Sequence, residues 1–148
     1  MTDPRVAVTV PATAEEAFRV YTERAADWLP AEHRFLRGSE IVVMEKGVGG
    51  RFYEQGADGA VVVRGTITEW APPERLAVTW RVGPGWGPAP DDEHASVVVV
   101  EFRPAGPGET EVSATYTHLE RHGDFAPVLR AAIGSGNTLE RYRSVVAQ

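Results

Sequence analysis

Short segments of alternating polarity, joined by short turns, fill the middle of this 148-residue chain and constrain its fold more than any other feature. Leu76, Val78 and Trp80, for example, share one face of a segment whose other face carries Ala77 and Thr79. Alternation with a period of two is typical of strands with one buried face. The segments predicted as strands in this region are residues 41–44, 51–55, 60–70, 76–82, 96–102 and 110–120. Their connections are too short for crossover helices, so we expect one antiparallel sheet.

A further strand and two short helices are predicted before this meander. Residues 5–10 alternate in polarity and form the candidate first strand. Thr13 and Glu16 have the spacing of a capping box, in which each side chain accepts a hydrogen bond from the backbone amide of the other residue. A helix should therefore begin at Ala14, and a second short helix is expected over residues 25–29.

The C-terminal segment changes to a helical period. Its apolar residues recur at intervals of three and four in two sets, Val128, Leu129, Ala132 and Ile133, and then Leu139, Tyr142 and Val146. Gly134 and Gly136 lie between the sets, and glycine is costly inside a helix. We expect two helices or one sharply kinked helix, with Ser135 or Asn137 capping the second part. A run of strands followed by a terminal helix predicts one α+β domain over residues 1–148, with the helix on one face of the sheet.

Composition and charge argue against several classes of protein. The chain carries 15 basic and 21 acidic residues, a formal net charge of −6, which disfavours nucleic acid and anionic membrane surfaces as partners. Its longest apolar run, Val97–Val100, is far shorter than the ~20 residues of a membrane-spanning helix, so we expect no membrane insertion. The first residues lack the charged and apolar regions of a signal peptide, and there is no cysteine. A cytoplasmic location is therefore expected.

Several strings, in their order and spacing, resemble the START-like, or SRPBCC, superfamily of helix-grip proteins. They are Val10–Phe18, Gly49–Phe52, Pro72–Leu76 followed by Thr79–Trp80, Thr117–Gly123 and Leu139–Tyr142. Within the superfamily, the chain is most similar to the branch related to the ATPase activator of the ninety-kilodalton heat-shock chaperone. The resemblance implies a curved antiparallel sheet of about six to seven strands, wrapped around a long C-terminal helix with a cavity between them. Members include lipid and hormone carriers, polyketide cyclases and chaperone regulators, so the resemblance implies fold more strongly than function.

Aromatic residues are the candidates for lining such a cavity. Trp80 and Phe102 lie on strand faces that should point toward the terminal helix, which carries Tyr142. Four further candidates fall on segments that surround the cavity mouth in the family, namely Trp28, Phe35, Phe52 and Trp86. Each of these residues has an ordinary alternative role in core packing. Trp86 lies in a loop rich in glycine and proline. Its indole could belong to a lid, contact a partner or simply pack within the loop.

Tyr116 and His118 are the polar candidates. Both have the parity of Val112 and Ala114 on the last strand, so both should face the terminal helix. There a phenol and an imidazole could orient a ligand carbonyl or hydroxyl, or could simply be satisfied within the core.

Catalytic and metal chemistry have weaker signals. His118, Glu120 and His122 alternate along one segment and have the residue types of a divalent-metal site, but no fourth ligand is evident, so we expect no metal. A general acid–base site has two candidates, His118 with Tyr116, and Glu54, which would suit that task only if burial raised its pKa. The glycine-rich stretch at residues 47–50 leads into a strand rather than a helix, which is not the pattern of a nucleotide-binding loop, and we expect no cofactor.

These observations predict a protein that binds a small, largely apolar molecule between the sheet and the C-terminal helix, and that is more plausibly a carrier than an enzyme. Two alternatives share the scaffold. One is a cyclase or aromatase that folds a polyketide-like substrate and moves protons. The other is a module that regulates a chaperone, or that docks on another protein or on a second copy of itself, through an exposed apolar patch.

Overall fold

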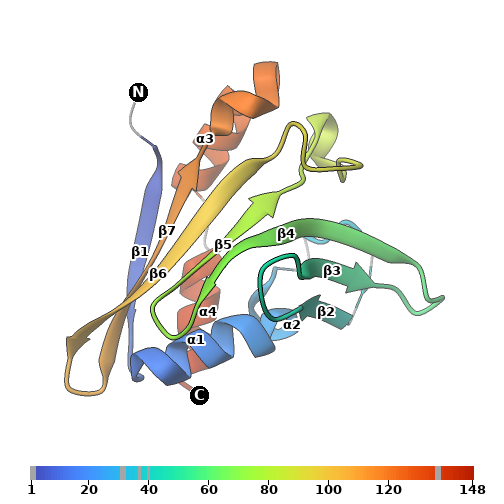
Figure 1. The fold of residues 1–148 in the computed structure, drawn as a ribbon. Helices are drawn as coiled ribbons and strands as arrows, with labels where there is room; N and C mark the ends of the chain where they lie inside the picture. Colours follow the sequence, from blue (N-terminus) through green and yellow to red (C-terminus); the bar gives the residue numbers. More distant parts are fainter. Residues whose placement is uncertain (1–2, 31–32, 37, 40, 136–137) are drawn as a thin grey trace.

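The computed structural model describes residues 3–30, 33–36, 38–39, 41–135 and 138–148. Among these residues, seven strands form one curled antiparallel sheet in the order β1-β7-β6-β5-β4-β3-β2 (Figure 1). The strands are β1 (Arg5–Val10), β2 (Ile41–Met44), β3 (Arg51–Gln55), β4 (Val61–Ala71), β5 (Arg75–Trp80), β6 (Ser96–Gly106) and β7 (Glu109–Thr117). The predicted α+β helix-grip fold is confirmed, and each predicted strand is present with ends that differ by a few residues.

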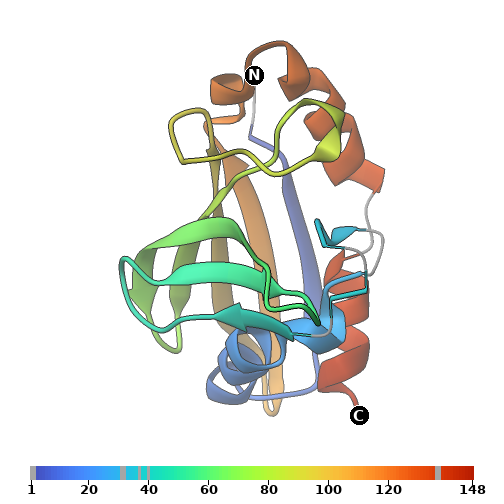
Figure 2. The ribbon, with the colours of Figure 1, turned by 90° about the vertical axis from the view of Figure 1, so that its right-hand side faces the viewer.

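The helices gather on one side of the sheet, which we call its inner face (Figure 2). The helices α1 (Ala14–Glu23) and α2 (Ala25–Trp28) follow β1, and a 3-10 turn, η2 (Pro84–Trp86), follows β5. A second 3-10 segment, η3 (Leu119–Phe125), leads into α3 (Ala126–Ser135) and α4 (Thr138–Val146). As the sequence predicted, α1 begins after Thr13, whose Oγ1 accepts a hydrogen bond of 3.3 Å from the Glu16 amide.

The C-terminal segment consists of two helices rather than one long helix, in keeping with the first of the two arrangements expected from its glycines. Ser135 is the last residue of α3, and α4 begins at Thr138. The other predicted cap, Asn137, lies outside the described residues. The helix α4 packs against β1, α1 and α2, whereas α3 packs against η3.

A tightly packed group of aromatic rings lies between α1, α2, α4 and the sheet, and we call it the closed core. Its rings are Phe18, Tyr21, Trp28, Phe102 and Tyr142, all of them buried. Tyr21 stacks on Trp28 with ring centroids 4.7 Å apart and meets Tyr142 edge-on at 5.3 Å. The Tyr142 hydroxyl donates a hydrogen bond of 2.6 Å to the Ala17 carbonyl, which fixes α4 to α1. Buried polar groups satisfied in this way leave the core both apolar and specific.

A second apolar group, which we call the upper cluster, lies between β5, η3 and α3. Its fully buried members are Val82, Leu119, Leu129 and Ile133. Trp80 and Tyr116 pack against both the upper cluster and the main core, and both remain only partly buried. The interior is thus divided into two packed regions that meet at these two rings.

A β-bulge in β4 shapes the sheet next to this junction. Phe52 pairs with Gly65 and the following residue, Tyr53, pairs with Val63, so Arg64 is the extra residue. A bulge bends its strand and re-aims a side chain, and here Arg64 lies beside the buried ring of Phe52. A Cβ atom on Gly65 would lie 1.9 Å from the Thr79 carbonyl oxygen, so no side chain fits at this position while β4 and β5 keep their spacing.

Candidate functional site

Three of the nine candidate residues belong to the closed core. Trp28, Phe102 and Tyr142 are at most 2% exposed, and each contacts other rings of that group. The Trp28 indole nitrogen donates a hydrogen bond to the Tyr21 carbonyl. Burial raises the pKa of Tyr142, whose hydroxyl is therefore a stable donor rather than a titrating group. These three residues therefore pack within the core and stabilise the fold.

Phe35 and Phe52 surround a buried arginine that the sequence analysis did not identify. The Arg64 guanidinium carbon lies 4.7 Å from the centre of the Phe35 ring and 5.5 Å from that of Phe52. Its Nη1 donates to the His33 carbonyl at 2.9 Å and to Glu54 Oε2 at 2.5 Å. The signal available in the sequence was an arginine followed by a glycine inside a predicted strand, because a glycine within a strand often marks a bulge.

Glu54 is fully buried, but its pKa is not raised, as a general acid at this position would require. Its oxygens accept hydrogen bonds from the amides of Phe35 and Leu36, the Ser39 hydroxyl and Arg64. Burial alone would raise the pKa of Glu54, but the two backbone amides and the guanidinium outweigh it and hold the pKa below its ordinary value. Glu54 is therefore a fixed carboxylate that ties Phe35, Leu36 and Ser39 to β3 and β4.

Trp80 and Tyr116 lie on the inner face of the sheet, the face expected from their parity, and meet at the junction with ring centroids 5.4 Å apart. The His122 ring also meets Trp80 edge-on, with centroids 6.2 Å apart, and was not predicted as part of this group. Its Nε2 accepts a hydrogen bond from the Ser96 amide at 3.1 Å and lies 2.8 Å from Ser96 Oγ. Burial lowers the pKa of His122 and raises that of Tyr116, so both rings are neutral near pH 7.

Trp86 is 47% exposed on the 3-10 turn η2. Its ring meets that of Phe125 edge-on at 5.3 Å, so the loop after β5 contacts η3 beside the upper cluster. Its backbone has φ = 66°, an uncommon value for a residue other than glycine. The loop position expected for Trp86 is thus correct, and its indole lies at the surface next to the junction.

The predicted orientation of His118 is wrong. The strand β7 ends at Thr117, and His118 has φ = 59° in the left-handed region. This conformation turns the chain and breaks the alternation that placed His118 on the face of Tyr116. Its imidazole is exposed on the opposite, outer face of the sheet, with Nδ1 3.5 Å from Glu120 Oε1.

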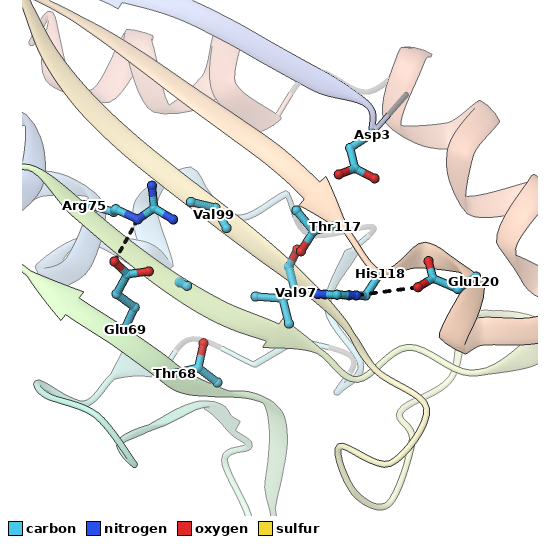
Figure 3. Close-up of a pocket in the computed structure, with 10 residues that line it drawn as sticks. Asp3, Thr68, Glu69, Arg75, Val97, Val99, Thr117, His118 and Glu120 are labelled. Carbon is cyan, nitrogen blue, oxygen red and sulfur yellow. Dashed lines mark hydrogen bonds and ion pairs between the residues drawn. The ribbon is translucent and has the colours of Figure 1, made fainter. Parts of the chain in front are cut away.

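His118 instead lines a shallow groove of about 490 Å³ on this outer face (Figure 3). Val97 and Val99 of β6 form its apolar floor, and an ion pair of 2.8 Å between Arg75 and Glu69 lies at one end. A second hollow of about 350 Å³ lies between α1 and the Pro72–Pro73 turn. Neither of these two hollows is the cavity between sheet and terminal helix that the resemblance implied.

The predicted alternation of His118, Glu120 and His122 is not realised. These residues belong to the end of β7 and to η3 rather than to one strand, and His122 is held by Ser96. Within the described part of the chain, no three histidine, aspartate or glutamate side chains gather closely enough to hold a metal ion. Among the same residues, no helix has both the length and the apolar character required to cross a membrane.

With this geometry in view, the comparison with protein families is decisive. Residues 11–146 match the model of the family described as Activator of Hsp90 ATPase homolog 1-like protein. The chain belongs to this family. The resemblance noted from the sequence is thereby confirmed, and the match covers both the closed core and the junction. A search of curated proteins found no match.

Among solved structures, two proteins similar to this AHSA1-like chain have sequence identities of 25% or more. An anthrahydroquino-gamma-pyrone synthase, Txn09, complexed with SUM, is 42% identical, with a TM-score of 0.68 over 98% of this chain and 97% of the synthase. The self-sacrificing resistance protein CalC from Micromonospora echinospora is 25% identical, with a TM-score of 0.68 over 98% and 94% of the two chains. Protein NE0264 from Nitrosomonas europaea, at 19% identity and a TM-score of 0.66 over 98% and 94%, shows the shared fold alone.

In this AHSA1-like protein, the junction therefore combines three kinds of group. Trp80, Tyr116 and Phe35 offer aromatic surface, and Tyr116 offers a hydroxyl that stays protonated. Arg64 adds a buried positive charge beside Phe35. An apolar site with a few placed polar groups is the usual composition of a small-molecule site.

Proposed function

We propose that this protein binds a small, largely apolar aromatic molecule between the inner face of the sheet and α3, at the junction formed by Trp80, Tyr116 and Phe35. One observation carries the proposal. Trp80 and Tyr116 lie on the inner face of the sheet, yet both are only partly buried, whereas the aromatic rings of the closed core are fully enclosed. Apolar surface that faces inward without being covered is surface that a ligand can cover.

The comparisons support an oxygenated, polycyclic aromatic ligand. The synthase that is 42% identical over nearly the whole chain carries an anthrahydroquinone in its name, and such a ring system is planar, apolar on its faces and oxygenated at its edge. A planar ligand of this kind would stack on Trp80 or Tyr116 through offset or edge contacts.

Binding is tested by titrating the protein with alizarin, a planar dihydroxyanthraquinone, and following tryptophan fluorescence. We expect saturable quenching that weakens in Trp80→Phe and an affinity that falls roughly tenfold in Tyr116→Ala, because a stacking partner is lost. His118→Gln on the outer face is the matched control and should leave the affinity unchanged. Quenching that does not saturate, or that is the same in all variants, would contradict the proposal.

Ring closure is the second candidate function, favoured by the name of the same synthase. A protonated Tyr116 hydroxyl could donate a hydrogen bond to a ketone while a neighbouring phenol oxygen attacks its carbon. A suitable probe is ortho-hydroxydibenzoylmethane, which closes to flavone and releases one water. Accelerated flavone formation that falls by roughly 10²-fold or more in Tyr116→Phe would support catalysis. Alizarin binding without any acceleration would leave binding as the function.

A further inference from the structure

We propose that the Arg64 guanidinium is a ligand-binding group that donates a hydrogen bond to a ring-attached oxygen, a carbonyl or a phenolate, of the aromatic ligand. This inference rests on the proposed function and deepens it, because it requires the ligand to carry such an oxygen. Four observations support it, concerning the partners of Glu54, the free donors of Arg64, its position and its aromatic surroundings.

The first observation is the complete set of partners around Glu54. Each oxygen accepts two hydrogen bonds: Oε1 from the Leu36 amide and the Ser39 hydroxyl, and Oε2 from the Phe35 amide and Arg64. A carboxylate has about four acceptor positions, so this one has no need of a ligand. Of the two members of the ion pair, only the arginine has capacity left.

The second observation is the set of donors on Arg64 itself. A guanidinium carries five N–H donors. Among the described residues, the hydrogen bonds of Arg64 use Nη1 alone, and the buried Nε has no partner. The side chain is only 9% exposed, and a buried donor without an acceptor is destabilising. Nη2 makes neither of these hydrogen bonds, so it is the donor that a ligand oxygen would meet.

The third observation is the position of Arg64 beside the junction. The Arg64 carbonyl accepts a hydrogen bond of 2.9 Å from the Arg81 amide, so its backbone lies next to the residue that follows Trp80. Phe35 contacts the Arg64 guanidinium and also packs against the upper cluster, as Trp80 does. The cation therefore lies beside Phe35, a ring that packs against the same apolar cluster as Trp80 and Tyr116.

The fourth observation is the pair of rings around the cation. Phe35 and Phe52 are both within 5.5 Å of the guanidinium carbon, a contact that stabilises the charge without using its N–H groups. The ring contacts therefore occupy none of the N–H groups, and Nη2 makes no hydrogen bond with an acceptor among the described residues. In this apolar setting a hydrogen bond to a charged donor is stronger than in water, which makes the oxygen a determinant of specificity.

The test compares two planar probes of similar shape, 2-acetylnaphthalene and 2-isopropenylnaphthalene, in which a methylene group replaces the carbonyl oxygen. Their affinities are measured by competition with alizarin in wild type, Arg64→Lys and Arg81→Lys. Arg81 directly follows β5 and pairs with Asp92, so it is the matched control. We expect wild type to prefer the ketone by roughly tenfold, and we expect Arg64→Lys, but not Arg81→Lys, to remove most of that preference.

The outcomes separate this inference from the function beneath it. If both probes bind and their affinity ratio is the same in wild type and Arg64→Lys, the role of Arg64 is overturned and ligand binding stands. If neither probe nor alizarin binds to wild type, both proposals are overturned.

A second measurement on wild type does not depend on the folding of any variant. The infrared carbonyl stretch of bound, carbon-13-labelled acetylnaphthalene should lie below its frequency in hexane, because a hydrogen bond weakens the C=O bond. The same shift in Tyr116→Phe would assign that bond to a donor other than the phenol. A stretch at the hexane frequency, or a shift lost in Tyr116→Phe, would overturn the assignment to Arg64.

Discussion

The closed core and the junction contain the same types of aromatic residue, but these residues have different roles in the two regions. In the closed core, Tyr21, Trp28 and Tyr142 contact one another, and two hydrogen bonds to backbone carbonyls satisfy the Trp28 and Tyr142 polar atoms. At the junction, Trp80 and Tyr116 contact each other and two apolar groups but remain partly exposed. The closed core fixes the terminal helix against the sheet. At the junction, part of the aromatic surface of Trp80 and Tyr116 is left uncovered by other residues of the protein.

The difference shows that aromatic content alone does not mark a binding site. Trp28, Phe102 and Tyr142 were as plausible from sequence as Trp80 and Tyr116, yet they support the fold rather than the proposed ligand. Substitutions should therefore separate the two regions by stability and by binding.

The largest loss of stability is expected when a ring of the closed core is removed. Phe102→Ala should lower the free energy of unfolding by ~3–5 kcal/mol, because a fully buried ring leaves a cavity. Trp80→Ala removes a larger ring but should lower it by only ~2 kcal/mol, because part of that ring is already in contact with water. Urea denaturation of both variants measures the difference. Equal losses would mean that the junction is as closed as the core.

A loss of ~3 kcal/mol is expected for Glu54→Gln, which leaves the buried Arg64 charge without its counter-charge. The effect should depend on pH. The carboxylate pKa is lower in the folded protein than in the unfolded chain, so its stabilisation is present above about pH 4 and is lost as the pH falls through the folded value.

Wild type should therefore lose stability in acid more steeply than Glu54→Gln, and the two stability curves should converge as the pH decreases. Urea denaturation at a series of pH values checks this. Parallel curves down to acid pH would show that the Glu54 pKa is not depressed.

A smaller effect, ~1 kcal/mol, is expected for Tyr142→Phe, which keeps the ring but removes the hydrogen bond to the Ala17 carbonyl. The matched change at the junction is Tyr116→Phe, which should cost less because that hydroxyl belongs to a partly exposed side chain. Thermal unfolding of the two variants makes the comparison. A greater loss for Tyr116→Phe would reverse our assignment of roles.

The smallest effect on stability is expected for Trp86→Ala, below about 0.5 kcal/mol, because the indole is 47% exposed. Its contact with Phe125 places it beside the proposed site, so alizarin should dissociate faster from this variant, as followed by stopped-flow fluorescence. An unchanged dissociation rate would show that Trp86 takes no part in closing the site.

Alternation along the strands was sufficient to predict the sheet and the inward faces of Trp80, Phe102 and Tyr116, because the period of two continues as long as the strand does. The same rule failed at His118, one residue beyond the end of β7, where a left-handed conformation reverses the side chain. Strand ends depend on hydrogen bonds to neighbouring strands, and these are not written in the local pattern.

The Glu54–Arg64 pair could not be predicted for a related reason. Arg64 reaches the inner face through a bulge, which shifts the alternation of β4 by one residue. The partners of Glu54 come from residues 15 to 19 positions away in the chain, in a segment without regular periodicity. Sequence reasoning therefore identified the aromatic surface of the candidate site but not its charge.

Gly65 has a consequence for sorting related sequences. Its Cα lies so close to β5 that even a methyl group would meet the Thr79 carbonyl oxygen at 1.9 Å. A homologue with any other residue at the aligned position must hold these two strands further apart, and its neighbouring arginine, if present, would be aimed differently. The identity of this one residue should therefore divide homologues into those whose interior has the shape described for this protein and those whose interior has a different shape.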